Sequence, residues 1–151
     1  MLLPVPHHKQ IGTSDCLAAC AAMALAYIGQ PVPYNQLLTL LGVGPIGAPR
    51  RNIFRCTSPL VEVAYREANI PLLAEIVQHG LPVIVFVDTG ELPYWSYATS
   101  HAVVVVGVQA ELIFVNDPAF SESPIQIVAG DFDLAWLNAD YMCAVISRKQ
   151  N

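Results

Sequence analysis

The chain has 151 residues, of which 54% are hydrophobic and only 13% are charged. This length is typical of one domain, and this apolar fraction is enough for a large core, so we expect residues 1–151 to form a single domain. The net charge of -5, with only seven Lys and Arg residues, argues against a nucleic-acid partner, because phosphate binding needs clustered positive charge.

The first predicted element is a long apolar helix. Residues 16–28 are dominated by Ala, Leu and Met, and they follow Ser14 and Asp15, either of which is a good N-cap. Gly29 is suited to end the helix. Because this segment is apolar on nearly every face, we expect it to be central and buried.

Three shorter helices are predicted next in the chain. Pro33 at a helix start predicts a helix over residues 33–41, followed by an irregular loop over residues 42–51. We expect another helix over residues 57–70, because four of its apolar residues have the spacing of one helical face: Val61, Ala64, Tyr65 and Ala68. A last short helix is expected over residues 74–79.

The hydrophobic pattern changes to that of strands after Pro82. Five short runs rich in β-branched residues are separated by turn residues: V-I-V-F-V, A-V-V-V-V-G-V, L-I-F-V, I-Q-I-V and Y-M-C-A-V-I. They predict an antiparallel sheet, with one helical turn over residues 131–137 that carries Phe132 and Trp136 inward. Helices followed by strands indicate an α+β fold, in which N-terminal helices pack on one side of a C-terminal antiparallel sheet.

Hydropathy and cysteine content bear on location and metal binding. The mean hydropathy is +0.47, but the apolar runs at residues 17–28 and 102–108 are shorter than the roughly 20 residues that span a bilayer. The N-terminal M-L-L-P-V-P-H-H-K does not have the pattern of a signal peptide. We therefore expect a cytoplasmic protein without a membrane span, and with reduced cysteines. No C-x-x-C pair or His-rich partner accompanies Cys16 and Cys20, so we expect neither a metal nor a cofactor.

Cys16 is the candidate nucleophile. It lies in the first turn of the buried helix, where free backbone N–H groups and the helix dipole favour a thiolate. The adjacent Asp15 opposes this effect unless its side chain turns away to cap the helix, so a nearby imidazolium is needed. The alternative is that Cys16 is a small buried residue among alanines, an interpretation that also suits the other three cysteines, Cys20, Cys56 and Cys143.

His101 is the candidate general base, because it stands at the edge of a strongly predicted central strand. The other histidines, His7, His8 and His79, are expected at the surface. Taken alone, His101 could equally be a hydrogen-bonded histidine of the core.

Hairpin geometry selects the partner of His101. If residues 109–111 form a three-residue turn, Val108 pairs with Leu112, and His101 lies on the same face as Asp117, one diagonal step away. Asp117 would then orient the imidazole, whereas a slip of one residue would bring Asn116 to this face instead. Asp117 also suits a simple turn, because Asn-Asp-Pro is a common way to leave a strand.

Gln10 is the candidate oxyanion donor. It precedes the helix, so its side-chain amide could reach the N-terminus of the helix and act together with the Cys16 backbone N–H. On its own, Gln10 is an ordinary polar loop residue.

The loop over residues 88–100 contains several aromatic side chains. Among them Tyr94 and Trp95 are candidates for a wall of a substrate groove, since such side chains supply contact area at little entropic cost. Trp95 could instead cover the apolar edge of the sheet. Arg50 and Arg51 could meet an acidic substrate, but adjacent loop arginines are more often only solvated.

Three segments carry a resemblance to a known family: Q-I-G-T-S-D-C-L-A-A-C, H-A-V-V-V-V-G-V and I-F-V-N-D-P-A. The chain resembles the papain-like cysteine peptidases, in particular the double-glycine leader peptidases that process bacteriocins and related precursors. The resemblance covers almost the whole domain. It implies a papain-like fold with four functional residues: Cys16 as nucleophile, His101 as general base, Asp117 as third member and Gln10 as oxyanion donor.

Two features depart from this family. Leu17 stands where the family usually has Gly after the nucleophile, so it could narrow the groove or contact the substrate. The leader peptidases are typically fused to a membrane ABC exporter, which this chain does not contain, so a separate exporter is a candidate partner.

The expected function is that of a cysteine endopeptidase acting on a peptide or leader peptide through a Cys16 acyl-enzyme. A thiol acyltransferase would use the same thioester. A peptide-binding module that retains the fold without turnover is the alternative from a different class. Retention of all four candidate groups favours an enzyme.

Overall fold

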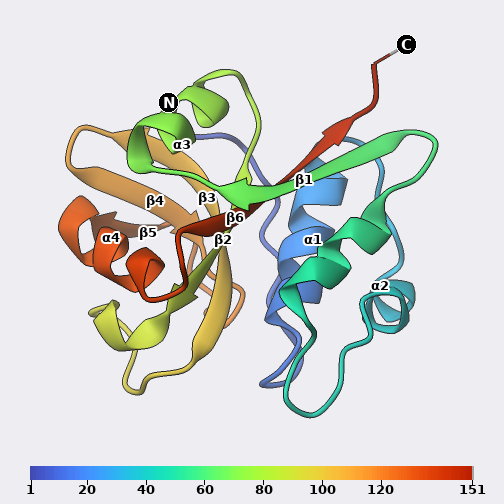
Figure 1. Ribbon diagram of the computed structural model, residues 1–151, viewed down its shortest axis with the longest axis horizontal. Coiled ribbons are helices and arrows are strands. Elements are labelled where there is room, and N and C mark those ends of the chain that lie inside the picture. The colour runs from blue at the N-terminus through green and yellow to red at the C-terminus, as the bar shows by residue number, and fades with distance from the viewer. Residues whose placement is uncertain (151) are drawn as a thin grey trace.

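The computed structural model describes residues 1–150, which form helices around one six-stranded antiparallel sheet (Figure 1). The strand order is β1-β6-β2-β3-β4-β5. The strands are β1 (Val61–Glu67), β2 (Val83–Asp88), β3 (Ser100–Gln109), β4 (Leu112–Asn116), β5 (Ile125–Val128) and β6 (Met142–Arg148). The helices are α1 (Cys16–Tyr27), α2 (Tyr34–Leu40), α3 (Ile70–Gln78) and α4 (Ala129–Leu137), with 3-10 helices η1 (Arg50–Cys56) and η2 (Thr89–Glu91). The predicted α+β class is confirmed, and none of these helices has the length and apolar character needed to cross a membrane.

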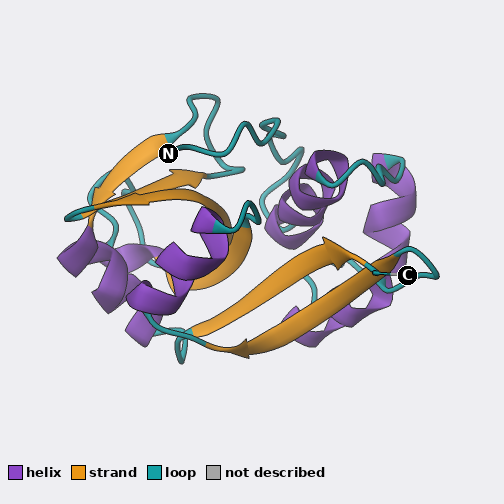
Figure 2. Cartoon of the chain, turned by 90° about the horizontal axis from the view of Figure 1, so that it is seen from above, coloured by secondary structure: helices purple, strands orange, loops and turns teal. Residues whose placement is uncertain are grey.

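The helices lie on both sides of the sheet. Figure 1 shows α1 and α2 to one side of the central strands and α3 and α4 to the other, and Figure 2 shows the same separation from above. The N-terminal helices α1 and α2 thus share one side, as expected, whereas α3 and α4 cover the other side, which the sequence did not predict. The cause is visible in β2, where Val83 through Val87 are all buried, because a strand without polar alternation is covered on both faces.

Three predicted helices are confirmed in type and place. Helix α2 spans Tyr34–Leu40 within the predicted residues 33–41. Helix α1 buries eight of its twelve residues, so it is the central apolar helix that its composition predicts. Helix α4 carries Phe132 and Trp136 into the core, where both are fully buried. Helix α3 is longer than the predicted residues 74–79, because the Asn69 side chain caps it by accepting the Leu72 N–H.

The segment predicted as a helix over residues 57–70 is instead strand β1. It pairs antiparallel with β6 from Val61 opposite Arg148 to Glu67 opposite Met142. Its sequence, V-E-V-A-Y-R-E, also has the period of two that a strand requires, since Val61, Val63 and Tyr65 alternate with residues that face the other way. The apolar residues of this segment fit both the spacing of a helix and that of a strand, and pairing with β6 selects the strand.

An N-terminal strap, residues 3–10, is hydrogen-bonded to β3 and β4. The Leu3 N–H donates to the Val106 carbonyl at 2.9 Å, and Asn116 Nδ2 donates to the Val5 carbonyl at 3.2 Å. At its far end the Gln10 N–H donates to the Pro118 carbonyl at 2.8 Å. The strap therefore brings Gln10 next to the segment that follows β4.

The β3–β4 hairpin differs from its prediction at the turn but not at the site. Gln109 pairs with Leu112, so the turn has two residues rather than three. A bulge between Val105 and Gly107 then shifts the register by one residue, and Val104 pairs with Asn116. A three-residue turn would have produced the same register at this end of the hairpin. His101 and Asp117 therefore lie on the same face of the sheet, as predicted.

Candidate active site

His101 and Asp117 form a buried pair. His101 lies at the start of β3 and Asp117 directly follows β4. The Nε2–H of His101 donates to Asp117 Oδ1 at 2.7 Å, and both side chains are almost completely shielded from solvent. Asn116 points away, toward Val5 of the strap. Of the two residues left open by the sequence, the structure brings Asp117 to the imidazole.

The Asp117 carboxylate has three further hydrogen-bond donors. Its Oδ1 accepts the Ala119 N–H at 2.9 Å, while Oδ2 accepts the Tyr94 hydroxyl at 2.8 Å and the Trp95 Nε1–H at 3.0 Å. Burial alone would raise the pKa of Asp117, but hydrogen bonding and the charge of His101, with these donors, hold it below its ordinary value. Asp117 is thus an anion fixed in position.

The two aromatic residues predicted for a groove wall have different positions. Trp95 lines a groove that also contains Cys16 and His101. It packs edge-on against His101, with 4.7 Å between the ring centroids. Tyr94 does not line this groove, because its hydroxyl is directed at Asp117 and its ring packs on Phe120. The aromatic loop therefore encloses the His101–Asp117 pair, which its sequence did not indicate.

The environment of His101 favours its charged form. Burial lowers the pKa of the imidazole, but the hydrogen bond and charge of Asp117, together with Cys16, raise it to about 9. At neutral pH His101 is therefore an imidazolium. Because Nε2 is committed to Asp117, the other ring nitrogen is the one available to a reacting group.

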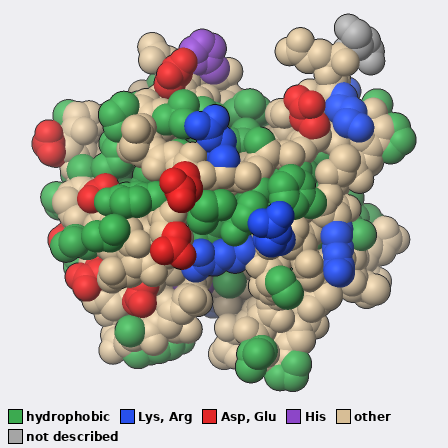
Figure 3. Space-filling model, viewed as in Figure 1, with side chains coloured by type: hydrophobic (Ala, Val, Ile, Leu, Met, Phe, Trp, Pro, Cys, Tyr) green, Lys and Arg blue, Asp and Glu red, His purple; other side chains and the backbone are tan. Residues whose placement is uncertain are grey.

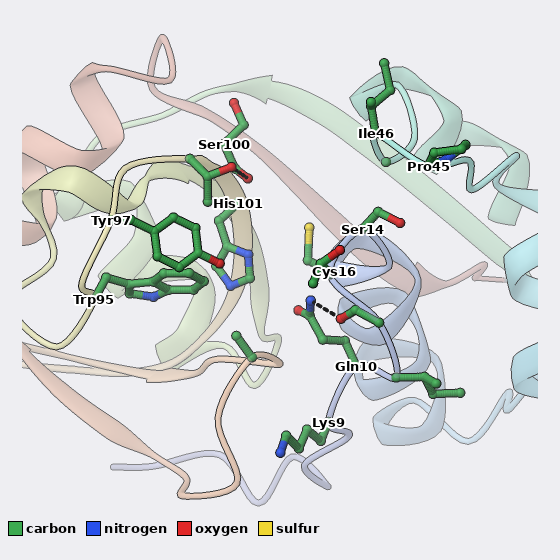
Figure 4. Close-up of a pocket in the computed structure, with 16 residues that line it drawn as sticks. Lys9, Gln10, Ser14, Cys16, Pro45, Ile46, Trp95, Tyr97, Ser100 and His101 are labelled. Atoms are coloured by element: carbon green, nitrogen blue, oxygen red, sulfur yellow. Dashed lines mark hydrogen bonds between the residues drawn. The ribbon is translucent and has the colours of Figure 1, made fainter.

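Cys16 lies across from His101 at the N-terminus of α1. Figure 4 shows its sulfur directed into the pocket between Ser14 and His101. Cys16 is half-buried, whereas the other three cysteines are buried. Burial raises the pKa of Cys56 and of Cys143 to about 11, and it raises that of Cys20 as well. Among the cysteines of residues 1–150, Cys16 is therefore the one whose sulfur is not buried.

Asp15 is turned away from Cys16, but not to cap the helix. Its carboxylate accepts the Ile11 and Gly12 N–H groups, each at 2.8 Å, and the Tyr34 hydroxyl at 2.5 Å. Burial alone would raise the pKa of Asp15, but these bonds keep it below its ordinary value. The expected side-chain cap is therefore absent from α1. Asp15 instead fixes the loop that carries Gln10, and nothing in the sequence pointed to Tyr34 as its partner.

Gln10 lies beside the N-terminus of α1. Figure 4 shows its amide next to Cys16, and its Nε2 donates to the Gly12 carbonyl at 2.9 Å. An amide nitrogen carries two hydrogens, so this bond leaves one for a ligand. The backbone N–H of Cys16, the first residue of α1, belongs to the group of helix N–H donors that have no partner within the helix.

A groove extends to both sides of Cys16 and His101. The wider arm has a volume of about 590 Å³ and the narrower arm about 260 Å³, and both are lined by these two residues. Gln10, Trp95 and Tyr97 line the wide arm, whereas Leu17, Arg50 and Phe86 line the narrow one. The arrangement suits an extended chain whose middle passes the sulfur. Within residues 1–150 no group of three or more His, Cys, Asp and Glu side chains is arranged to hold a metal.

The remaining histidines are less exposed than expected in two of three cases. His79 is exposed, but His7 and His8 are half-buried. His7 Nε2 donates to the Phe120 carbonyl at 2.6 Å, and His8 stacks on Tyr34 at 4.3 Å between ring centroids. Both lie on the strap, whose packing a local pattern could not reveal.

Comparison with known proteins identifies the family. The model of the peptidase C39-like family matches residues 2–144, which is nearly the whole chain. The chain belongs to the peptidase C39-like family. No curated protein matches it significantly.

Solved structures of C39 peptidases share the fold. The peptidase domain of Streptococcus ComA, a bifunctional ABC transporter of a quorum-sensing pathway, superposes with a TM-score of 0.77 at 20% identity, covering 95% of this chain and 98% of that one. A double-glycine-motif protease of an AMS/PCAT transporter, solved with its leader peptide, gives 0.73 at 23% identity, with 98% and 94% covered. A Bacillus anthracis protein described as C39-like gives 0.77 at 14% identity, with 99% and 98% covered. The expected papain-like peptidase fold is confirmed.

Leu17 marks the difference from the usual C39 pattern. Its side chain is 4% exposed and forms part of the wall of the narrow arm. It packs into the core on this side, and Cys16 remains half-exposed beside it. In this C39-like chain, a leucine after the cysteine is therefore compatible with an accessible sulfur.

Proposed function

We propose that the protein is a cysteine endopeptidase in which Cys16 is the nucleophile. One observation carries this proposal: the half-buried Cys16 and the imidazolium of the His101–Asp117 pair lie where the wide and narrow arms of the groove meet. A thiolate next to an imidazolium is the reactive form of a catalytic cysteine. A groove on both sides accommodates a peptide that continues past the cleaved bond.

The first step forms the acyl-enzyme. The Cys16 thiolate attacks the peptide carbonyl carbon, and the developing oxyanion accepts hydrogen bonds from the Cys16 N–H and the Gln10 amide. The C–N bond then breaks, and the imidazolium of His101 gives its proton to the leaving nitrogen. The products are a thioester on Cys16, a free amine and a neutral His101.

The second step releases the acyl product. Neutral His101 takes a proton from water, whose oxygen attacks the thioester carbon, and the C–S bond breaks. The products are a carboxylic acid, the Cys16 thiolate and the His101 imidazolium, so the starting state is restored. Asp117 keeps the ring in position throughout and stabilises its charged form.

Further elements of the proposal concern organisation and partners. A single cluster of buried apolar residues supports the chain forming one peptidase domain. The free state of all four cysteines favours a cytoplasmic location. One structural neighbour is a transporter protease solved in complex with a leader peptide, and another is the peptidase domain of an ABC transporter. They favour a peptide substrate, with a separate membrane exporter as a partner.

Selective alkylation tests the proposal. We expect iodoacetamide to label Cys16 selectively, while the three buried cysteines stay unmodified. His101→Ala should abolish this selectivity, and His79→Ala, at an exposed histidine, should preserve it. Labelling is read by peptide mass spectrometry at each cysteine.

The alternatives give different results. If Cys16 reacts no faster than the buried cysteines, or is indifferent to His101→Ala, the peptidase proposal fails and a peptide-binding module takes its place. If Cys16 is reactive but an added amine captures the acyl group faster than water does, the protein is an acyltransferase.

A further inference from the structure

The narrow arm of the groove contains a positively charged group close to Cys16. Arg50, the first residue of η1, lines this arm together with Phe86 and Ala102, the residue that follows His101. The remaining wall is largely apolar. An arginine in a pocket of about 260 Å³ that also contains the sulfur is placed to contact whatever passes the reaction centre.

The Arg50 guanidinium is held in a defined orientation. Its Cζ lies 5.0 Å from the centroid of the Phe86 ring, and its Nη1 donates to the Ala139 carbonyl at 3.1 Å. Stacking and a backbone hydrogen bond restrict the side chain before any ligand arrives, so little conformational entropy remains to be lost on binding. The guanidinium carries five N–H donors, and only one is used by this bond.

No carboxylate of residues 1–150 forms an ion pair with Arg50. This contrasts with His101, whose charge is balanced by Asp117. A half-buried guanidinium with free donors is an anion site, because a carboxylate can accept two parallel N–H bonds from it. Figure 3 shows several Lys and Arg side chains on one face of the protein, with Asp and Glu side chains interspersed among them.

We propose that the narrow arm selects substrates with an acidic side chain, Glu or Asp, within a few residues of the scissile bond, and that Arg50 binds its carboxylate. This inference rests on the proposed peptidase function and adds the substrate class. A side chain is favoured over a chain end because the groove continues past Cys16 into the wide arm. The apolar wall formed by Phe86 and Leu17 would contact the methylene groups of such a residue.

Peptide electrophiles provide the test, since the natural substrate need not be known. Acetylated tripeptide chloromethyl ketones of alanine, with one position changed to Glu or to its neutral counterpart Gln, alkylate Cys16 at rates that intact-mass spectrometry measures. At the position that reaches the narrow arm, we expect the peptide with Glu to alkylate Cys16 about tenfold faster than the peptide with Gln. A hydrogen bond between a carboxylate and the Arg50 guanidinium would produce a difference of this size. The preference should fall as salt is added.

Variants at two adjacent arginines provide matched controls. Arg50→Gln should remove the Glu preference, and Arg50→Lys should retain part of it, because Lys keeps the charge but not the planar fork. Arg51→Gln should leave it unchanged, since Arg51 is exposed, lies over Tyr65 and does not line the arm. The Glu-to-Gln ratio on the unaltered protein does not depend on whether a variant folds.

The outcomes separate this inference from the function on which it rests. If iodoacetamide labels Cys16 selectively but Glu and Gln peptides react equally at every position, the acidic preference is wrong and the peptidase proposal stands. If Cys16 is not selectively reactive, both fail. Trialanine with a free carboxyl end could slow the alkylation of Cys16 by iodoacetamide more than trialanine carboxamide does. If it does, and Arg50→Gln removes this difference, the arm binds a chain end and the inference is overturned.

Discussion

Single side chains at the site differ in charge because of their immediate partners rather than their exposure. His101 and Cys20 are both buried, yet burial raises the pKa of Cys20 while the pKa of His101 is raised against the effect of burial. The hydrogen bond and charge of Asp117, together with Cys16, stabilise the positive charge of His101, whereas the charge of Asp117 disfavours a thiolate at Cys20. The charge of His101 is therefore a property of the pair, and a change at Asp117 should be measurable at His101.

Titration of His101 tests this coupling. We expect its Cε1–H NMR resonance to titrate near pH 9, and Asp117→Asn to lower that midpoint toward the ordinary value of 6.5 because the anion is removed. Cys16→Ser should lower it too, since Cys16 also favours the charged form. A midpoint in Asp117→Asn equal to that of the unaltered protein would contradict the assignment.

The same shift predicts a pH dependence of stability. A pKa raised on folding means that the contribution of His101 to the free energy of unfolding is complete below about pH 6.5 and is lost as the pH rises through about 9. Urea unfolding between these pH values should show this loss, and Asp117→Asn should flatten it.

At the scale of elements, a four-residue turn shapes the rim of the groove. Gly44 and Gly47 exchange two backbone hydrogen bonds of 3.0 and 3.1 Å, which places Pro45 and the fully exposed Ile46 at the tip. Figure 4 shows this tip across the pocket from His101. Gly47 has a φ of +103°, a conformation that residues with a Cβ rarely adopt. The turn therefore depends on glycine at this position.

Two glycine-to-alanine substitutions should have opposite effects. Gly47→Ala should lower the free energy of unfolding by about 1–3 kcal/mol because of backbone strain. Gly130→Ala, in α4 with no atom within 4 Å of the added Cβ, should be neutral or stabilising by up to about 1 kcal/mol. Denaturant unfolding measures both, and equal effects would show that the turn is not strained.

At the scale of the whole molecule, the N-terminal strap joins the sheet to the reaction centre. Leu3 and Val5 are buried, and the strap is hydrogen-bonded to β3, β4 and the segment after Asp117. The same segment continues to Gln10 and to the loop fixed by Asp15. Stability of the sheet and the position of the oxyanion donor thus depend on one length of chain.

Truncation of Leu3 in the strap and of Leu2, which directly precedes it, tests this dependence. Leu3 is buried, with an exposed fraction of 7%. Leu3→Ala should therefore lower the free energy of unfolding by about 2–3 kcal/mol. Leu2→Ala, at a residue that is 43% exposed, should change it by less than about 1 kcal/mol. Chemical denaturation gives both values, and similar losses for the two would show that the strap is not part of the core.

Local pattern was sufficient for α1, α2, α4 and five of the strands. Helix α1 is long and has good boundary residues, and the strands are rich in β-branched side chains, so local energetics and tertiary packing agree there. It was insufficient for β1, whose apolar residues fit either period until β6 pairs with it. Likewise, the helix predicted over residues 57–70 ends before Pro71, whereas this proline lies in the first turn of α3.

The amino-acid sequence by itself determined the family, the α+β class and the order of Gln10, Cys16, His101 and Asp117 along the chain, because these depend on local composition and motif. Tertiary structure decided which groups meet. The bulge near Val106 restores the facing of His101 and Asp117, and packing of distant segments brings the aromatic loop onto Asp117 and Arg50 into the narrow arm. Such contacts join residues far apart in sequence, and their geometry depends on register and packing that no local segment encodes.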